Sequence, residues 1–148
     1  MRKPRLFLDS NIIIKGLVSQ WSTSRAVLVL CAAQNFKLAL AAEVDSEVTG
    51  AFARMPGTAR VDPDIISLYD RWKKHARPEV IRPMKPTEVG FAETLIAHQH
   101  DAPVLAAAIH FKPDFLITNN RRHFNDQVAK STGLVIVSES EFFALIRI

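Results

Sequence analysis

Short apolar runs alternate along the chain with longer segments whose apolar residues recur at helical spacing. The short runs predict β-strands at residues 5–9, 37–41, 115–118 and 134–137, with a weaker one at 80–82. The longer segments predict helices at residues 11–18, 23–35, 43–54, 63–76, 88–99, 103–111 and 139–146. Strands and helices that alternate in this way are typical of βαβ units, so we expect an α/β fold with a mainly parallel sheet.

Several boundaries carry their own markers. Ser22 precedes the second helix, Asp62 and Pro63 open the fourth, and Gly133 follows a helical stretch at the position of a left-handed cap. Three prolines interrupt the pattern between residues 77 and 86, which indicates a connection or an extended edge rather than a domain linker. We therefore expect one domain over residues 1–148.

Composition narrows the class of protein only slightly. Hydrophobic residues make up 48% and charged residues 23%, which is ordinary for a folded protein. The single cysteine, Cys31, lies in an apolar run and is expected in the core, which suits a reducing cytoplasm. The N-terminus has no apolar segment of signal-peptide length and no run approaches membrane-spanning length, so we expect a cytoplasmic protein with no membrane contact. A net charge of +4 weakly favours a polyanionic partner.

Asp9 follows the first apolar run and lies in the sequence Leu8-Asp9-Ser10-Asn11. In parallel α/β sheets, ligands bind beyond the carboxyl ends of the strands, so an acid placed there is a candidate for chemistry. The competing interpretation is that Asp9 only caps the next helix, because Asp, Ser and Asn readily accept hydrogen bonds from free N–H groups.

Glu43 and Glu47 begin the helix after the second strand and share one helical face. We interpret Glu43 as part of a solvated surface, since acids in a first turn are favoured by the helix dipole. Glu47 is one turn further in, where that benefit fades, so a functional role is more plausible for it.

Asp101 precedes a strongly apolar helix with Pro103 in its first turn; a capping role and a metal-ligand role are compatible there.

The last polar segment, Thr118-Asn119-Asn120-Arg121-Arg122, follows a buried-looking strand. Asn pairs are common in turns, which is the simpler interpretation. Hydroxyl and amide groups at a strand end can also orient a water or bind a metal, and arginines can bind phosphate through two parallel hydrogen bonds.

Taken in order, these four segments resemble the PIN-domain family of metal-dependent ribonucleases. The resemblance implies a three-layer α/β/α sandwich whose carboxyl edge holds one or two Mg²⁺ or Mn²⁺ ions. The three core acids would be Asp9, Glu47 and Asp101. The supporting polar residues would be Asn11, Thr118, Asn119 and Asn120.

One position departs from the family pattern. At the turn that begins with Thr118 the family usually carries an acid, and this chain has Asn120. An amide retains an oxygen ligand but removes a negative charge, so a second metal would bind more weakly. Asp126 is near in sequence and is the alternative acid. Arg121 and Arg122 adjoin the expected site and could contact substrate phosphate.

Other chemical groups receive structural interpretations. No cysteines or histidines have structural-zinc spacing; His98 and His100 are expected to be exposed or capping, and His123 stands alone. Trp21 and Trp72 are interpreted as packing residues rather than base-stacking ones. A basic cluster closes the fourth helix and is interpreted as a solvated face: Lys73, Lys74, His75 and Arg77.

Three functions remain open at this stage. The first is an Mg²⁺- or Mn²⁺-dependent endoribonuclease, of the kind found as the toxin of bacterial toxin–antitoxin pairs, with RNA as substrate, an antitoxin partner and a possible homodimer. The second is a catalytically weak or inactive module that binds nucleic acid or a partner, which Asn120 motivates. The third is a phosphotransferase that forms an aspartyl intermediate; we rank it low, because those enzymes usually carry an Asp where this chain has Asn11.

Overall fold

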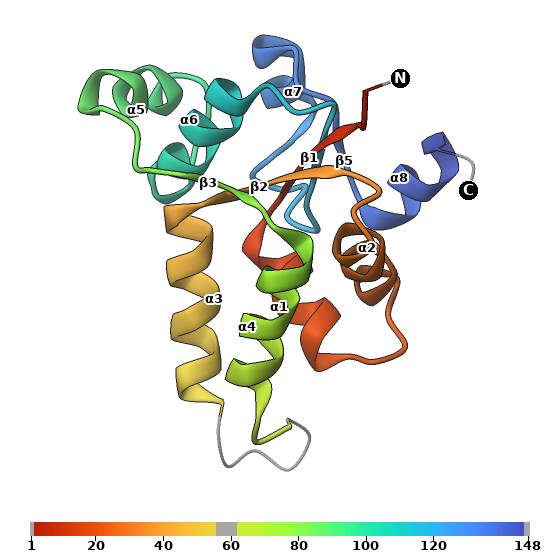
Figure 1. Cartoon of the computed structure of the whole chain (residues 1–148). Coiled ribbons are helices and arrows are strands. Elements are labelled where there is room, and N and C mark those ends of the chain that lie inside the picture. The colour runs from red at the N-terminus through yellow and green to blue at the C-terminus, as the bar shows by residue number, and fades with distance from the viewer. Residues whose placement is uncertain (1, 56–61, 147–148) are drawn as a thin grey trace.

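The central sheet contains five parallel strands in the order β3-β2-β1-β4-β5 (Figure 1). A computed structural model describes residues 2–55 and 62–146. Its strands are β1 (Arg5–Leu8), β2 (Lys37–Ala41), β3 (Glu79–Ile81), β4 (Phe115–Ile117) and β5 (Ile136–Val137). The expected parallel α/β sheet is confirmed, and the weak strand expected near residue 80 is the edge strand β3.

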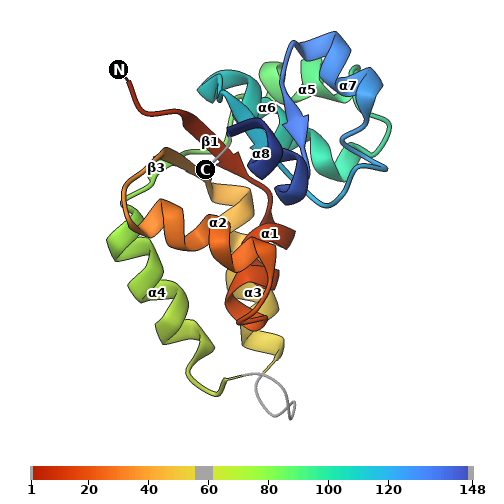
Figure 2. The same ribbon diagram turned by 90° about the vertical axis from the view of Figure 1, so that its right-hand side faces the viewer.

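Helices cover both faces of the sheet, which gives the expected three-layer α/β/α arrangement (Figures 1 and 2). One layer contains α1 (Ser10–Val18), α2 (Thr23–Ala32), α3 (Ala42–Arg54), α4 (Ile65–Ala76) and, beside α2, α8 (Glu139–Ile146). The other layer contains α5 (Pro86–Glu93), α6 (Ala102–Phe111) and α7 (Asp126–Thr132). A short 3₁₀ turn, Gln99–Asp101, leads into α6.

Burial follows the hydrophobic pattern closely. Phe7 in β1 and Leu105 in α6 are fully buried, as expected for a strand and a helix that are apolar on all sides. Cys31 is buried, and Trp72 is buried with its indole N–H donating to the Leu28 carbonyl, which confirms both as core residues. Among the described helices, none is long and apolar enough to cross a membrane.

The structure corrects four details of the sequence prediction. The helix expected over 88–99 ends at Glu93, where the Thr94 hydroxyl bonds back to the Phe91 carbonyl. The helical stretch before Gly133 is a separate helix, α7, which the strand-and-helix pattern left out and which Asn125 caps. Trp21 is 95% exposed, so its interpretation as a packing residue is wrong. The solvated interpretation of Glu43 is wrong as well, because it is half-buried.

The strand order reverses direction at one point, between β1 and β4. The chain moves outward from β1 through β2 to β3 on one side, and from β4 to β5 on the other. In doubly wound sheets the crevice at such a reversal, beyond the carboxyl ends of the strands, is where ligands bind. Asp9 follows β1 and Thr118 follows β4, so the topology places both at this crevice.

Candidate metal centre

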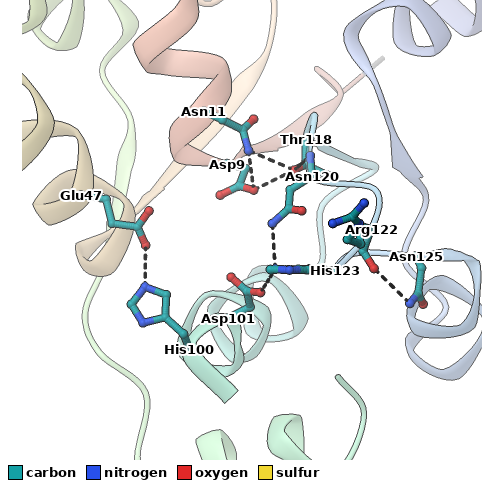
Figure 3. Close-up of polar contacts among 10 residues, drawn as sticks. All are labelled: Asp9, Asn11, Glu47, His100, Asp101, Thr118, Asn120, Arg122, His123 and Asn125. Atoms are coloured by element: carbon teal, nitrogen blue, oxygen red, sulfur yellow. Dashed lines mark hydrogen bonds and ion pairs between the residues drawn. The ribbon is translucent and has the colours of Figure 1, made fainter. Parts of the chain in front are cut away.

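Asp9 is held rigidly at the end of β1. Its Oδ1 accepts the Ser10 N–H at 2.8 Å, and its Oδ2 accepts the Thr118 hydroxyl at 2.7 Å and the Asn11 side-chain amide at 3.1 Å (Figure 3). Its own N–H donates to the Ile117 carbonyl of β4. Asp9 therefore does cap α1, as one interpretation predicted, and it also lies at the crevice with only 7% of its surface exposed.

The turns after β1 and β4 are joined by the predicted supporting residues. The Asn11 side-chain oxygen Oδ1 accepts the Asn119 backbone N–H at 3.1 Å, and the Thr118 hydroxyl oxygen accepts the Asn120 backbone N–H at 2.9 Å. Thr118 is fully buried. A hydroxyl that both donates to the Asp9 carboxylate and accepts from the backbone has a fixed orientation, so this network determines where the Asp9 oxygens point.

Glu47 approaches from α3 on the other side of the crevice. Its Oε2 accepts the Ser10 hydroxyl at 2.7 Å. Its Oε1 lies 4.0 Å from His100 Nε2 (Figure 3). Ser10 thus links the helix that Asp9 caps to the second acid, a role that sequence reasoning did not assign to it. Glu43 lines the same cavity of about 460 Å³ as Glu47, and its Oε1 is buried without a hydrogen-bond partner among the described residues.

Asp101 approaches from the 3₁₀ turn before α6. It occupies the cap position of α6, but its side chain makes no capping hydrogen bond. Instead its Oδ2 lies 2.6 Å from His123 Nδ1, and the His123 ring stacks on His98 with 3.4 Å between ring centroids. An ionised carboxylate can only accept, so a hydrogen bond to Asp101 needs the proton on Nδ1, whereas a hydrogen bond from the Asn120 amide to the same atom needs Nδ1 without it. His123, which stands alone in the sequence, is therefore brought by the fold against both Asp101 and His98.

The remaining predicted residues divide between the site and the surface. The Asn120 side-chain nitrogen lies 3.0 Å from the same His123 Nδ1, so Asn120 faces the site (Figure 3). Arg121 instead donates to Asp126 and to Glu141, each at 2.9 Å. The Asp126 side chain is 97% exposed. Arg122 is exposed.

Negative charge accumulates around Asp9. Burial raises the pKa of Asp9 above its ordinary value, and the charges of Glu47 and Asp101 raise it further. The hydrogen bonds from Thr118 and Ser10 act in the opposite direction. A cation between the three carboxylates would offset the repulsion that now opposes their ionisation.

The donor set suits a hard divalent cation. In the part of the chain that the structure describes, no three acids, histidines or cysteines are close enough together to enclose a metal as they stand. Yet three carboxylates approach one crevice, Glu47 has an accessible side chain, and Glu43 Oε1 lacks a partner. Oxygen ligands of this kind are the ones that Mg²⁺ and Mn²⁺ prefer, so the residues present fit such an ion.

Comparison with known families supports the same conclusion. The family model described as PIN domain matches residues 5–122, from the start of β1 to the turn after β4. The chain belongs to the PIN domain family. Proteins with PIN domains are generally divalent-metal-dependent nucleases, and the match includes all four segments of this centre. No curated protein matches the chain.

Solved structures share the PIN fold at low sequence identity. VapBC2 from Rickettsia felis, solved bound to a DNA fragment from its promoter, is 20% identical with a TM-score of 0.65, over 90% of this chain and 97% of that one. PAE2754 from Pyrobaculum aerophilum is 15% identical with a TM-score of 0.59, over 98% and 91%. FitAcB from Neisseria gonorrhoeae is 13% identical with a TM-score of 0.65, over 91% and 98%.

Proposed function

We propose that this PIN domain is an endoribonuclease that hydrolyses RNA phosphodiester bonds with Mg²⁺ or Mn²⁺ held by Asp9, Glu47 and Asp101. The observation that carries the proposal is the approach of three carboxylates to the crevice between β1 and β4, where burial raises the pKa of Asp9 and the charges of Glu47 and Asp101 raise it further. A bound divalent cation would supply a nucleophilic water and neutralise charge on the phosphoryl oxygens.

Each of the three proposed metal ligands has a distinct role. Asp9 is the fixed ligand, because Thr118 and Asn11 hold one of its oxygens. Glu47 is the adjustable ligand, since among the described residues only the Ser10 hydroxyl restrains it at hydrogen-bond distance. Asp101 is the third ligand, and His123 orients it. Outer partners of this kind set ligand geometry and typically change metal affinity by about 10–100-fold when lost.

Asn120 and the two arginines complete the site. Asn120 brings an oxygen ligand without a charge, so we assign the site one tightly bound cation rather than two. Arg122 is the better candidate for a phosphate contact, because it is exposed next to the site. Arg121 is already paired with two carboxylates and would have to leave them to bind substrate.

Cleavage assays test the proposal. The purified chain should cut RNA in Mg²⁺ or Mn²⁺ and stop when the cation is chelated. Asp9→Asn and Asp101→Asn should each abolish cleavage, whereas Asp126→Asn, which removes a charge from an exposed carboxylate outside the crevice, should not. Cleavage that persists unchanged in both core variants would contradict the assignment.

We further propose that the nuclease is the toxin of a toxin–antitoxin pair, with an antitoxin protein and a second copy of this chain as partners. The proposal extends the family assignment, and VapBC2, a structural neighbour, was solved on DNA from its own promoter. Expression of the chain alone should arrest bacterial growth, and expression of Asp9→Asn should not. Co-expression of the adjacent gene should restore growth and yield a complex.

The second candidate function is a PIN domain that binds nucleic acid without cutting it. Asn120, with one negative charge fewer than the usual acid, is the observation that favours it. Calorimetry with Mn²⁺ separates the two functions. The nuclease should take up the ion with affinity better than millimolar, and the binding module should not.

A further inference from the structure

A cavity of about 530 Å³ lies at the amino ends of the strands, opposite the acids. Five cationic residues line this basic cavity, from the N-terminal segment, the start of β2 and the loop after α4: Arg2, Lys3, Arg5, Lys37 and Arg77. They come from three separate stretches of sequence, so the fold and not local composition gathers them.

Few acids neutralise these cations. Arg2 pairs with Asp114 at 2.9 Å, and Lys37 lies 3.7 Å from Glu79. The Arg5 guanidinium donates to the Phe111 and Lys112 carbonyls and lies 4.0 Å from the centre of the Phe111 ring, contacts that orient it without cancelling its charge.

No described carboxylate pairs with Lys3 or Arg77. Both are exposed, and within the described ranges neither side chain has a hydrogen bond or ion pair. Arg77 ends α4 in a left-handed conformation, with φ of 48°, and the bond from its N–H to the Lys73 carbonyl fixes its backbone there. The basic cavity is thus a fixed positive surface with free donors, which is what an anionic chain recognises.

The basic cavity adjoins, along the sheet edge at β3, a series of cavities that reaches Glu47. It shares Pro78 with a second cavity of about 990 Å³, which Lys74 and Val80 also line. The second cavity in turn shares Ala42 and Ser46 with the cavity that Glu47 lines. Three adjoining cavities therefore run from one end of β2 to the other.

The length, charge and lining of these three cavities indicate which kind of polymer could bind along them. Strand β2 has five residues, so the path spans roughly 16 Å along the sheet. Its middle is close to neutral, because Lys73 and Lys74 balance Asp45 and Asp70, and Lys73 lies 3.4 and 3.7 Å from these two acids. None of the described residues that line the middle cavity is aromatic, so this part of the path offers polar contacts to an RNA backbone and no surface for stacked bases.

We propose that the basic cavity anchors backbone phosphates of single-stranded RNA whose neighbouring nucleotides lie at Asp9, Glu47 and Asp101. The anchor rests on the proposed nuclease function for its substrate. It makes the enzyme prefer RNA long enough to reach both ends of the sheet, and it reads no base sequence.

Binding of a labelled single-stranded RNA oligonucleotide tests the anchor without any cleavage. Fluorescence anisotropy compares Lys3→Ala/Arg77→Ala with a control of equal charge change, Arg54→Ala/Lys130→Ala, all in the Asp9→Asn chain with metal chelated. Arg54 ends α3 and Lys130 lies in α7, both exposed and outside the basic cavity. Loss of two phosphate contacts should reduce the magnitude of the slope of log K against log salt by about 1.4. It should also weaken binding roughly twentyfold near 0.1 M salt.

The outcomes separate the anchor from the nuclease. Equal binding by the test and control pairs would overturn the anchor, even if the unmodified chain cuts RNA. A selective loss of binding in the test pair, with no cleavage by the unmodified chain, would support the anchor and reject the nuclease. If duplex DNA shows the selective loss and single-stranded RNA does not, the proposed ligand class is wrong.

Discussion

The two ends of the central sheet carry opposite charges, and the two charges are held in different ways. At the carboxyl end, Asp9 is buried and its oxygens are bound by Ser10, Asn11 and Thr118. At the amino end, Lys3 and Arg77 are exposed with free side chains. A buried, oriented acid suits a small ion that requires fixed geometry, whereas exposed cations suit a flexible polyanion.

The difference also concerns stability. The charge at the amino end remains solvated, so folding does little to its free energy. At the carboxyl end Asp9 is largely removed from water, and its raised pKa shows that the folded chain disfavours its ionised form. Ionised Asp9 therefore reduces the stability of the fold when no cation is bound, as is common where a site is arranged for chemistry.

The largest effect on RNA cleavage should come from Glu47→Gln. The matched comparison is Glu43→Gln, because Glu43 lies on the same helical face. We expect Glu47→Gln to reduce RNA cleavage by at least about a hundredfold, beyond the range of a lost outer partner. Glu43→Gln should reduce it by less, because Glu43 is one turn nearer the start of α3 and has no contact with Ser10. Initial rates measured in Mn²⁺ give the comparison, and a larger loss in Glu43→Gln would exchange the roles of the two acids.

The next largest effect should be the loss of Mn²⁺ affinity in Thr118→Val. This substitution keeps the shape of a fully buried side chain and removes its hydroxyl. Asp9 then loses the 2.7 Å hydrogen bond that orients Oδ2, and Mn²⁺ affinity should fall by about 10–100-fold. Calorimetry measures the loss. Thr132→Val, whose hydroxyl donates to the Val128 carbonyl in α7, is the matched control and should bind Mn²⁺ normally.

A gain should follow from Asn120→Asp, which restores a charge beside His123. We expect Mn²⁺ to bind up to roughly tenfold more tightly, equivalent to about 1.4 kcal/mol. Asn119→Asp, one residue earlier on an exposed side chain, controls for net charge. Identical Mn²⁺ affinity in both variants would mean that the turn after β4 does not line the ion site.

The smallest effect should be on stability. Without divalent cations, Asp9→Asn should melt a few degrees higher than the unmodified chain near pH 7, because it removes an ionised group from a buried place. The pKa of Asp9 is raised on folding, so the folded chain binds the proton more tightly than the unfolded one. Unfolding free energy should therefore fall as pH rises from near 3.8 through the folded pKa, and remain lower above it.

Urea unfolding between pH 4 and 7 measures this dependence. The advantage of Asp9→Asn should be largest near neutral pH and shrink as the medium becomes acidic. Addition of Mn²⁺ should then stabilise the unmodified chain but not the variant, because only the former has the site intact. A variant that is less stable at every pH would show that the Asp9 cap, rather than its buried charge, dominates.

The carboxyl end could be predicted from sequence because its residues follow from general rules. Asp9 and Thr118 each follow an apolar strand, and parallel strands end at the same edge of a sheet. His123 could not be predicted, since its approach to Asp101 depends on how the turn after Asn120 folds against the 3₁₀ turn. Ser10 was visible only as a capping residue.

The basic cavity at the amino end of the sheet is harder to predict from sequence, for a different reason. The sequence groups Arg77 with the basic cluster that closes α4, and that interpretation is reasonable for the segment alone. The cavity forms only when the N-terminal segment, β2 and the loop after α4 meet. Surface charges follow no periodic pattern in the sequence that would predict which segments come together, whereas buried strands are recognisable by their apolar runs.

The central claim is that Asp9, Glu47 and Asp101 hold one divalent cation at the crevice between β1 and β4. Crystals of the unmodified chain grown or soaked with Mn²⁺ test it directly, because the anomalous signal locates the ion itself. The account predicts a peak within bonding distance, roughly 2.0–2.3 Å, of at least two of these three carboxylates. A well-ordered crystal with no peak there at millimolar Mn²⁺, or with the ion bound by other residues, would contradict it.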